Sequence, residues 1–155
     1  MKKRGLGLFF HHYQSRRNGM EIIMNALILK TYRITDLKFQ NHATATGKSK
    51  LETKYTYQVK FANNHTCRGE MKILVTDQEN PDTLTVDMTM VGIFEIVAEQ
   101  DKELLHKESF KQLYPFARAA VSTISSSTGI LPIIIPSVDI DAQDIYRYNP
   151  ELFSK

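Results

Sequence analysis

The stretch from Thr83 to Gly129, TLTVDMTMVGIFEIVAEQDKELLHKESFKQLYPFARAAVSTISSSTG, changes its apolar period once and thereby decides the fold class. Apolar and polar residues alternate from Leu84 to Met90, which predicts a strand with one buried face. Gly92 interrupts this alternation and predicts a bulge or a close backbone approach. After residue 98, apolar or small residues recur every three or four positions, which predicts a helix that ends at Gly129.

Pro115 stands inside this predicted helix, in the motif LYPFAR at residues 113–118. Proline has no N–H, and its ring clashes with the carbonyl group one turn earlier. We therefore expect the helix to kink or to restart at this residue.

Three further strands are predicted upstream of this stretch. The first covers residues 26–39, with a slip of phase at Thr35 and Asp36 that indicates a bulge. A polar loop at residues 40–50 separates it from a strand at 55–61, and another strand lies within 69–77. The short connections predict an antiparallel meander.

Downstream of Gly129, the apolar segment ILPIIIP at residues 130–136 cannot form a helix or a central strand, because it contains two prolines. We expect an extended loop, followed by a short helix that Asp141 can cap and on which Ile145 and Tyr148 share a face. Four strands followed by two helices predict an α+β fold, with one antiparallel sheet covered on one face by two helices.

The charge of the chain is unevenly distributed. Residues 1–19 contain five basic and no acidic residues, so the remainder, with fifteen basic and seventeen acidic residues, is mildly acidic. A basic arm of this kind can bind nucleic acid or anionic lipid.

We divide the chain into two parts. Residues 1–24 are a basic extension that is flexible or precedes the true start at Met20 or Met24, and residues 25–155 form one folded domain. No apolar run approaches the roughly 18 residues of a membrane span, and the lone Cys67 favours a reducing, cytoplasmic compartment.

No pattern in the sequence predicts catalysis, a cofactor or a metal. Glycine-rich phosphate loops, zinc motifs and nucleophile elbows are missing from the sequence. Cys67 next to Arg68 could have a lowered pKa, but no base is paired with it in the sequence. The acidic residues of DIDAQD at 139–144 resemble the start of a helix more than a calcium loop. We therefore predict that the protein is not an enzyme.

The sequence contains more apolar surface than two helices easily cover. Tyr55, Tyr57, Val59 and Phe61 form one stripe, and other apolar residues of the strands do not all share its phase. A rigid apolar loop bounded by prolines is suited to the wall of a groove. Surplus apolar surface of this kind predicts burial by a ligand or by another subunit.

The second half of the chain resembles the SecB family of export chaperones. In that family, a strand with a GIF-type motif leads to a helix with an LFPYAR-type motif, then to a crossover loop and a second helix. Gly92–Phe94 match the first motif and LYPFAR the second, with its two aromatic types exchanged. Residues 129–140 match the crossover loop, and TDLKF at residues 35–39 weakly resembles a segment near the family's start. The resemblance covers residues 28–149.

This resemblance implies an ATP-independent chaperone, assembled as a dimer of dimers, that holds unfolded or precursor proteins in apolar grooves. The client-binding residues that it implies, together with the apolar pattern, are Tyr55, Tyr57, Phe61, Ile93, Phe94, Leu131, Ile133 and Ile135. In the family the long helix contributes to the tetramer interface, and the corresponding candidates are Ala117, Ala120, Val121 and Ile124.

The sequence leaves three alternatives open for the partner of the protein: the SecA motor, an antitoxin and nucleic acid. The family contacts the SecA motor through acidic residues; Asp36 matches one of them, but Gln40 stands where the family usually has Glu, and the chain ends soon after the second helix. SecB-like proteins also occur beside toxin–antitoxin systems, so a dedicated chaperone of an antitoxin is the alternative. A nucleic-acid module that uses the basic arm is a third hypothesis, which the acidic body disfavours.

Overall fold

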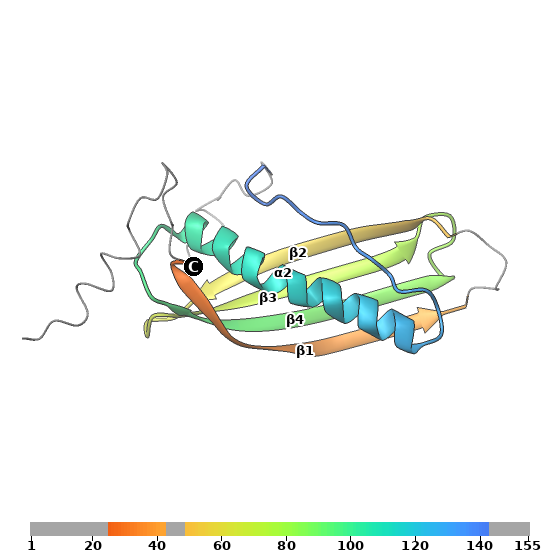
Figure 1. The fold of residues 1–155 in the computed structure, drawn as a ribbon, viewed down its shortest axis with the longest axis horizontal. Coiled ribbons are helices and arrows are strands. Elements are labelled where there is room, and N and C mark those ends of the chain that lie inside the picture. Colours follow the sequence, from red (N-terminus) through yellow and green to blue (C-terminus); the bar gives the residue numbers. More distant parts are fainter. Residues whose placement is uncertain (1–24, 43–48, 143–155) are drawn as a thin grey trace, which may run out of the picture.

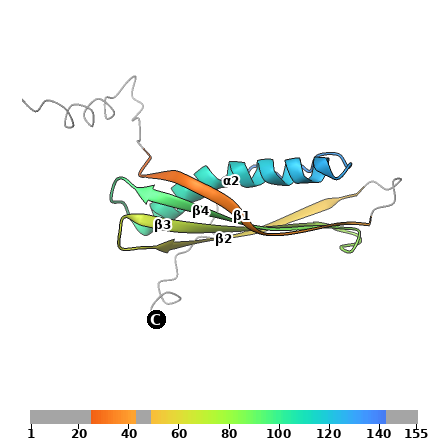
Figure 2. The same ribbon diagram turned by 90° about the horizontal axis from the view of Figure 1, so that it is seen from below.

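The computed structural model describes residues 25–42 and 49–142 of the chain. Four strands precede one long helix: β1 (Leu27–Asn41), β2 (Leu51–Phe61), β3 (Thr66–Asp77), β4 (Leu84–Ile96) and α2 (Lys102–Ser127). The strands form a single antiparallel sheet, and α2 lies across one face of it (Figures 1 and 2). The predicted α+β fold is confirmed.

The strand order is β1-β4-β3-β2, so the prediction of a simple meander is wrong for the first strand. β2, β3 and β4 do follow one another as hairpins, but β1 pairs with β4 at the far edge from β2. This is a Greek-key topology in which the first strand, and not the last, takes the place beside the far end of the three-strand meander. The lengths of the connections explain this order. The connection between β1 and β2, residues 42–50, is longer than a typical hairpin loop of two to five residues, whereas the connection between β2 and β3, residues 62–65, has a typical length.

The register of β1 shifts twice against β4, between Leu29 and Thr31 and between Ile34 and Asp36. The second shift confirms the bulge that the sequence predicts. Each extra residue turns the following side chains over, because side chains of a strand alternate between faces. Tyr32, Ile34 and Leu37 consequently stay on the same face as their partners in β4.

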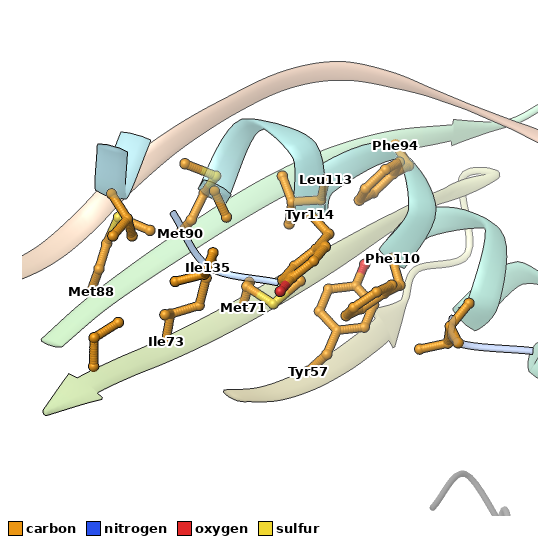
Figure 3. Packing of buried hydrophobic residues seen from close by; sticks show 14 of the residues in the cluster. Tyr57, Met71, Ile73, Met88, Met90, Phe94, Phe110, Leu113, Tyr114 and Ile135 are labelled. Atoms are coloured by element: carbon orange, nitrogen blue, oxygen red, sulfur yellow. The ribbon is translucent and has the colours of Figure 1, made fainter. Parts of the chain in front are cut away.

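The core lies between the sheet and α2. Alternate residues of β3 and β4 are buried on that face, as the apolar period predicts (Figure 3). The fully buried side chains include Met71, Ile73, Val75, Val86, Met88, Met90 and Phe94 of the sheet, together with Phe110 and Leu113 of α2.

Gly92 allows the helix to approach the sheet. A Cβ atom there would lie 3.0 Å from Leu113 Cδ1 and 3.1 Å from Leu29 Cδ1. Of the two expectations for this glycine, close approach is therefore the correct one, and the register shifts lie in β1 at other positions.

α2 begins after Asp101, whose side chain accepts the N–H of Leu104 at 2.7 Å. The helix continues through Pro115 to Ser127, so the expectation that it restarts at the proline is wrong. The ring of Pro115 is exposed, and the helix is held on the sheet by the buried residues on its other side. Gly129 has a φ of 89°, which fits the predicted end.

Residues 130–140, which we call the strap, run back along α2 in an extended form without regular secondary structure, as predicted (Figure 1). At its end, Asp139 accepts the N–H groups of Asp141 and Ala142 at 3.1 and 3.3 Å, the role expected of a helix cap. The predicted capping residue Asp141 instead pairs with Lys111 at 2.8 Å. The second helix itself, and the extension at 1–24, lie outside the described residues.

Candidate functional site

Two apolar surfaces flank α2 on the same face of the sheet. On one side, the β1 surface consists of Tyr32, Ile34, Leu37 and Phe116, which are 38–44% exposed. On the other side, the strap surface consists of Leu131 and Ile134. The partly buried Tyr55 of β2 lies beside Tyr114, which bonds the end of the strap, and the partly buried Phe61 lies at the start of α2, beneath Lys102. Monomeric proteins rarely leave such surfaces uncovered, so each is a candidate for binding.

The strap surface owes its form to the alternation of an extended chain. Ile133 and Ile135 are 5% and 1% exposed, and Figure 3 shows Ile135 packed beside Ile73 and Met71 of β3. Ile134, between them, is 79% exposed, and Leu131 is 88% exposed. The buried isoleucines therefore anchor the strap, and the exposed aliphatic side chains are candidates for contact with a partner.

A cluster of aromatic rings lies below the strap and the first half of α2. Tyr55 lies 5.7 Å from Phe110 and 6.0 Å from Tyr114, measured between ring centroids, and Phe110 stacks on Tyr114 at 4.9 Å. The hydroxyl of Tyr57 donates to Ser109 Oγ at 2.8 Å. Burial raises the pKa of Tyr114, so its hydroxyl stays a neutral donor. This cluster forms a rigid apolar floor.

The β1 surface contains a stacked pair of rings, Tyr32 and Phe116, with centroids 4.5 Å apart. A shallow hollow of about 320 Å³ lies beside this pair and is also lined by Leu29, Lys30 and Thr31. Gln112, one turn before Phe116, accepts the N–H of Leu29 at 2.9 Å and donates to the carbonyl of Leu27 at 2.7 Å. It therefore occupies the beginning of the β1 edge, because it takes hydrogen bonds that a neighbouring strand could make.

The predicted client-binding residues do not form one surface. Tyr57, Phe94, Ile133 and Ile135 lie in the core, so their side chains are not accessible in this structure. Tyr55 and Phe61 are partly buried, and Leu131 is exposed. Ile93 lies on the opposite face of the sheet, since it pairs with Arg68 and Thr31. Ile93 and Phe94 are neighbours in one strand, so alternation alone could have separated them.

Sequence reasoning missed Ile134 and Phe116. The signal for Ile134 was present, because two inward isoleucines at 133 and 135 require the residue between them to point outward. Phe116 and Ala117 are neighbours on the helix, so helical spacing does not decide which of them is buried, and the structure buries Ala117.

The four candidates for an oligomer interface divide by their place on α2. Ala117 and Val121 face the sheet and are fully buried within the chain. Ala120 and Ile124 are only partly buried and continue the column of Gln112 and Phe116, at intervals of four residues, toward the β1 side. Ala120 and Ile124 therefore remain candidates for an interface, and Ala117 and Val121 serve the core.

Asp36, the candidate contact for a motor protein, is exposed on the uncovered face of β1, where its register partner is Thr89. Arg33 and Lys38 lie on the same face of this strand, since their partners there are Val91 and Asp87. The surroundings of Asp36 are therefore of mixed charge.

Two side chains with reactive potential in the described part of the chain, Cys67 and His106, are largely buried. Burial raises the pKa of Cys67 to about 11, the opposite of the lowering that Arg68 could have caused, and Arg68 pairs instead with Glu70 at 3.1 Å. Burial likewise lowers the pKa of His106. Within residues 25–42 and 49–142, no three His, Cys, Asp or Glu side chains gather as metal ligands. In the same part of the chain, no helix is both long and apolar enough to cross a bilayer.

Comparison with known proteins shows that this chain is similar to SecB proteins in sequence and in fold. The model of a family described as "Preprotein translocase subunit SecB" matches residues 21–150. The protein-export protein SecB of Rhodospirillum centenum is 24% identical over 140 residues, which cover 86% of this chain and 82% of that protein. A SecB-like chaperone of Mycobacterium tuberculosis, solved in complex with a peptide from the HigA1 antitoxin, matches with a TM-score of 0.58 and 14% identity, over 73% of this chain and 88% of that one. At this identity the solved structure supports the fold alone.

Proposed function

The chain belongs to the SecB family, whose members are chaperones and not enzymes, and on this premise we propose that it is a holdase that binds unfolded polypeptides without ATP. The observation that carries the proposal is the strap surface. Leu131 and Ile134 are 88% and 79% exposed on a segment that two prolines and two buried isoleucines hold in place. A soluble chain has no structural use for two large aliphatic side chains displayed in this way.

An extended client chain suits this surface. Burial of one large aliphatic side chain stabilises a complex by about 1.5–3 kcal/mol, and the effect has no directional requirement. Several such contacts along a client would give useful affinity for many sequences. We assign the client contacts to Leu131, Ile134, Tyr55 and Phe61, and we assign to Tyr57, Phe94, Ile133 and Ile135 the role of the floor beneath them.

The β1 surface is our candidate for assembly into the dimer of dimers. Edge strands with exposed apolar residues tend to pair with another chain, and Ala120 and Ile124 of α2 extend the surface toward a second helix. Division of the two roles between the two sides of α2 allows a client and a neighbouring subunit to bind at the same time.

A dedicated client is the second candidate function. The solved SecB-like chaperone of similar fold is in complex with a peptide from an antitoxin, and one such partner would suit this chain equally. The mixed charge around Asp36, together with Gln40 in place of the usual acidic residue, favours this role over coupling to SecA. We expect co-purification from the native host to recover one dominant partner in this case and a spread of precursor proteins in the case of general export.

The holdase proposal is tested by light scattering of a chemically unfolded protein diluted into buffer without nucleotide. We expect the wild-type chain to suppress aggregation and the double variant Leu131→Ser/Ile134→Ser to suppress it several-fold less, at the same concentration. Leu104→Ser, which changes an aliphatic residue 36% exposed at the start of α2, is the matched control and should act like the wild type. A folded wild-type chain without any suppression would exclude the function.

A further inference from the structure

The backbone of the strap receives little support from regular structure. Within residues 25–42 and 49–142, no backbone–backbone hydrogen bond outside helices and strands involves residues 130–140. Pro132 and Pro136 also have no N–H to donate, and each restricts the residue before it to extended conformations. The path of the strap is therefore stiff, but hydrogen bonds of the sheet do not determine its position.

Three side chains of α2 supply hydrogen bonds to the strap instead. The Tyr114 hydroxyl donates to the carbonyl of Pro136 at 2.7 Å, and Arg118 Nε donates to the carbonyl of Ile135 at 2.9 Å. Ser125 Oγ accepts the N–H of Ile133 at 2.8 Å, while it donates its own proton to the carbonyl of Ser122 at 3.0 Å. These three residues are spaced by four and seven positions, so they lie on one side of the helix.

These bonds select which side chains of the strap are displayed. Successive residues of an extended chain point to opposite sides, so a slip by one residue would bury Ile134 and expose Ile133 and Ile135. All three are isoleucines, and burial alone discriminates poorly between the two registers. The three hydrogen bonds do discriminate, because each involves one particular backbone atom of the strap.

We propose that Tyr114, Arg118 and Ser125 are positioning residues that hold the strap in the one register in which Leu131 and Ile134 face an apolar, extended client. This inference rests on the holdase function proposed above and deepens it. It also gives two residues of the LYPFAR motif a role: Tyr114 and Arg118 are separated by one helical turn, and their bonds reach adjacent carbonyl groups of the strap. The carbonyl of Ile135 receives a charge-assisted bond, which is stronger than one between neutral groups.

The test uses the full-length chain and the double variant Tyr114→Phe/Arg118→Met, which removes both donors and keeps the ring and the aliphatic stem. Tyr114→Phe by itself serves as the milder variant in case the double variant does not fold. The probe is reduced and carboxymethylated α-lactalbumin, a permanently unfolded polypeptide, and its Kd is measured by titration. The matched control is Arg33→Met, which removes an exposed arginine from the opposite face of the sheet.

We expect the Ile133 amide of the double variant to exchange its hydrogen about tenfold faster, and the Kd for the probe to rise about tenfold, with smaller changes for Tyr114→Phe and none for Arg33→Met. Faster exchange with an unchanged Kd would overturn the inference and leave the holdase function standing. Unchanged exchange would also overturn it, because the strap would then be held without these bonds. A wild-type chain that does not bind the probe would overturn the holdase function and, with it, the role of the strap in client contact.

Discussion

Gly69 of β3 lies directly beneath the ring of Tyr57. A Cβ atom at this position would overlap the Tyr57 hydroxyl and lie 2.9 Å from its Cζ. The ring cannot easily move away, because its hydroxyl donates to Ser109 Oγ and the ring makes T-shaped contacts with Phe110 and His106 at 5.5 and 5.1 Å between centroids. The absence of a side chain at residue 69 is therefore needed for the aromatic floor of the strap surface.

We predict that Gly69→Ala lowers the free energy of unfolding by about 1–3 kcal/mol, the usual cost of an overpacked core. Urea denaturation measures this change. Tyr57→Phe removes the hydroxyl that the new methyl group overlaps, so the loss caused by Gly69→Ala should be smaller in a Tyr57→Phe background. Strictly additive losses would contradict the proposed overlap.

His106 connects stability to pH. Burial lowers its pKa below the usual value of about 6.5, an effect that Glu103 opposes and Lys107 reinforces. The unfolded chain therefore binds a proton more readily than the folded chain, and stability should be fully present above about pH 6.5 and fall as the pH decreases toward the lower folded pKa.

We expect the free energy of unfolding of the wild type to decrease between pH 7.5 and pH 5.5, by at most about 1.4 kcal/mol per pH unit for one proton. The variant His106→Gln, which does not titrate, should show a flatter dependence in urea titrations at the two pH values. Equal slopes in both proteins would assign the pH dependence to other groups.

At the scale of single elements, the LYPFAR motif organises one side of the sheet. Leu113 packs over Gly92, and Ala117 allows α2 to lie close to the sheet. Phe116 stacks on Tyr32 at the β1 side, while Tyr114 and Arg118 hold the strap on the other side. Pro115 itself lies inside the helix and is exposed.

We predict that Pro115→Ala stabilises the protein by about 1–3 kcal/mol, because a proline inside a helix removes one hydrogen bond and crowds the preceding turn. The ring is exposed, so its removal leaves no cavity. Thermal or urea unfolding measures the change. A destabilised variant would indicate that the rest of the fold depends on the local geometry that the proline imposes.

At the scale of the whole molecule, β1 is an edge strand whose helix-side face carries exposed apolar residues. Tyr32, Ile34 and Leu37 are exposed on it, and Gln112 occupies only its beginning. The two bulges keep these three side chains on the helix side, where a second copy of the chain could cover them together with Phe116.

We expect Leu37→Asp to reduce the size of the assembly, because a charge buried at an interface without a partner is costly. Leu37 is 42% exposed in the single chain, so the fold itself should tolerate the change. Size-exclusion chromatography with light scattering compares the masses. Gln58→Asp, at an exposed position on the other face of the sheet, is the control and should assemble like the wild type. If both variants assemble normally, the interface lies elsewhere.

Sequence reasoning predicted the elements better than the exposure of the candidate site residues. The phase slip at Thr35 and Asp36, the helix that ends near Gly129 and the extended strap are all confirmed, since each depends on local rules of periodicity, φ and ring geometry. The order of strands was wrong, because local patterns do not state which edge β1 joins. Which residues contact a client stays a prediction, but the sequence did not distinguish the buried Tyr57 and Phe94 from the exposed Leu131.

The sequence by itself determined the fold class and the family, because alternation, helical spacing and the LYPFAR motif are local patterns of residues close together in the chain. Only the tertiary structure decided which apolar side chains are left for a partner. Exposure depends on where α2 and the strap lie over the sheet, and three hydrogen bonds between residues 8 to 22 positions apart set the position of the strap. The local pattern of α2 does not predict where the strap lies, and the local pattern of the strap does not predict which residues of α2 it contacts.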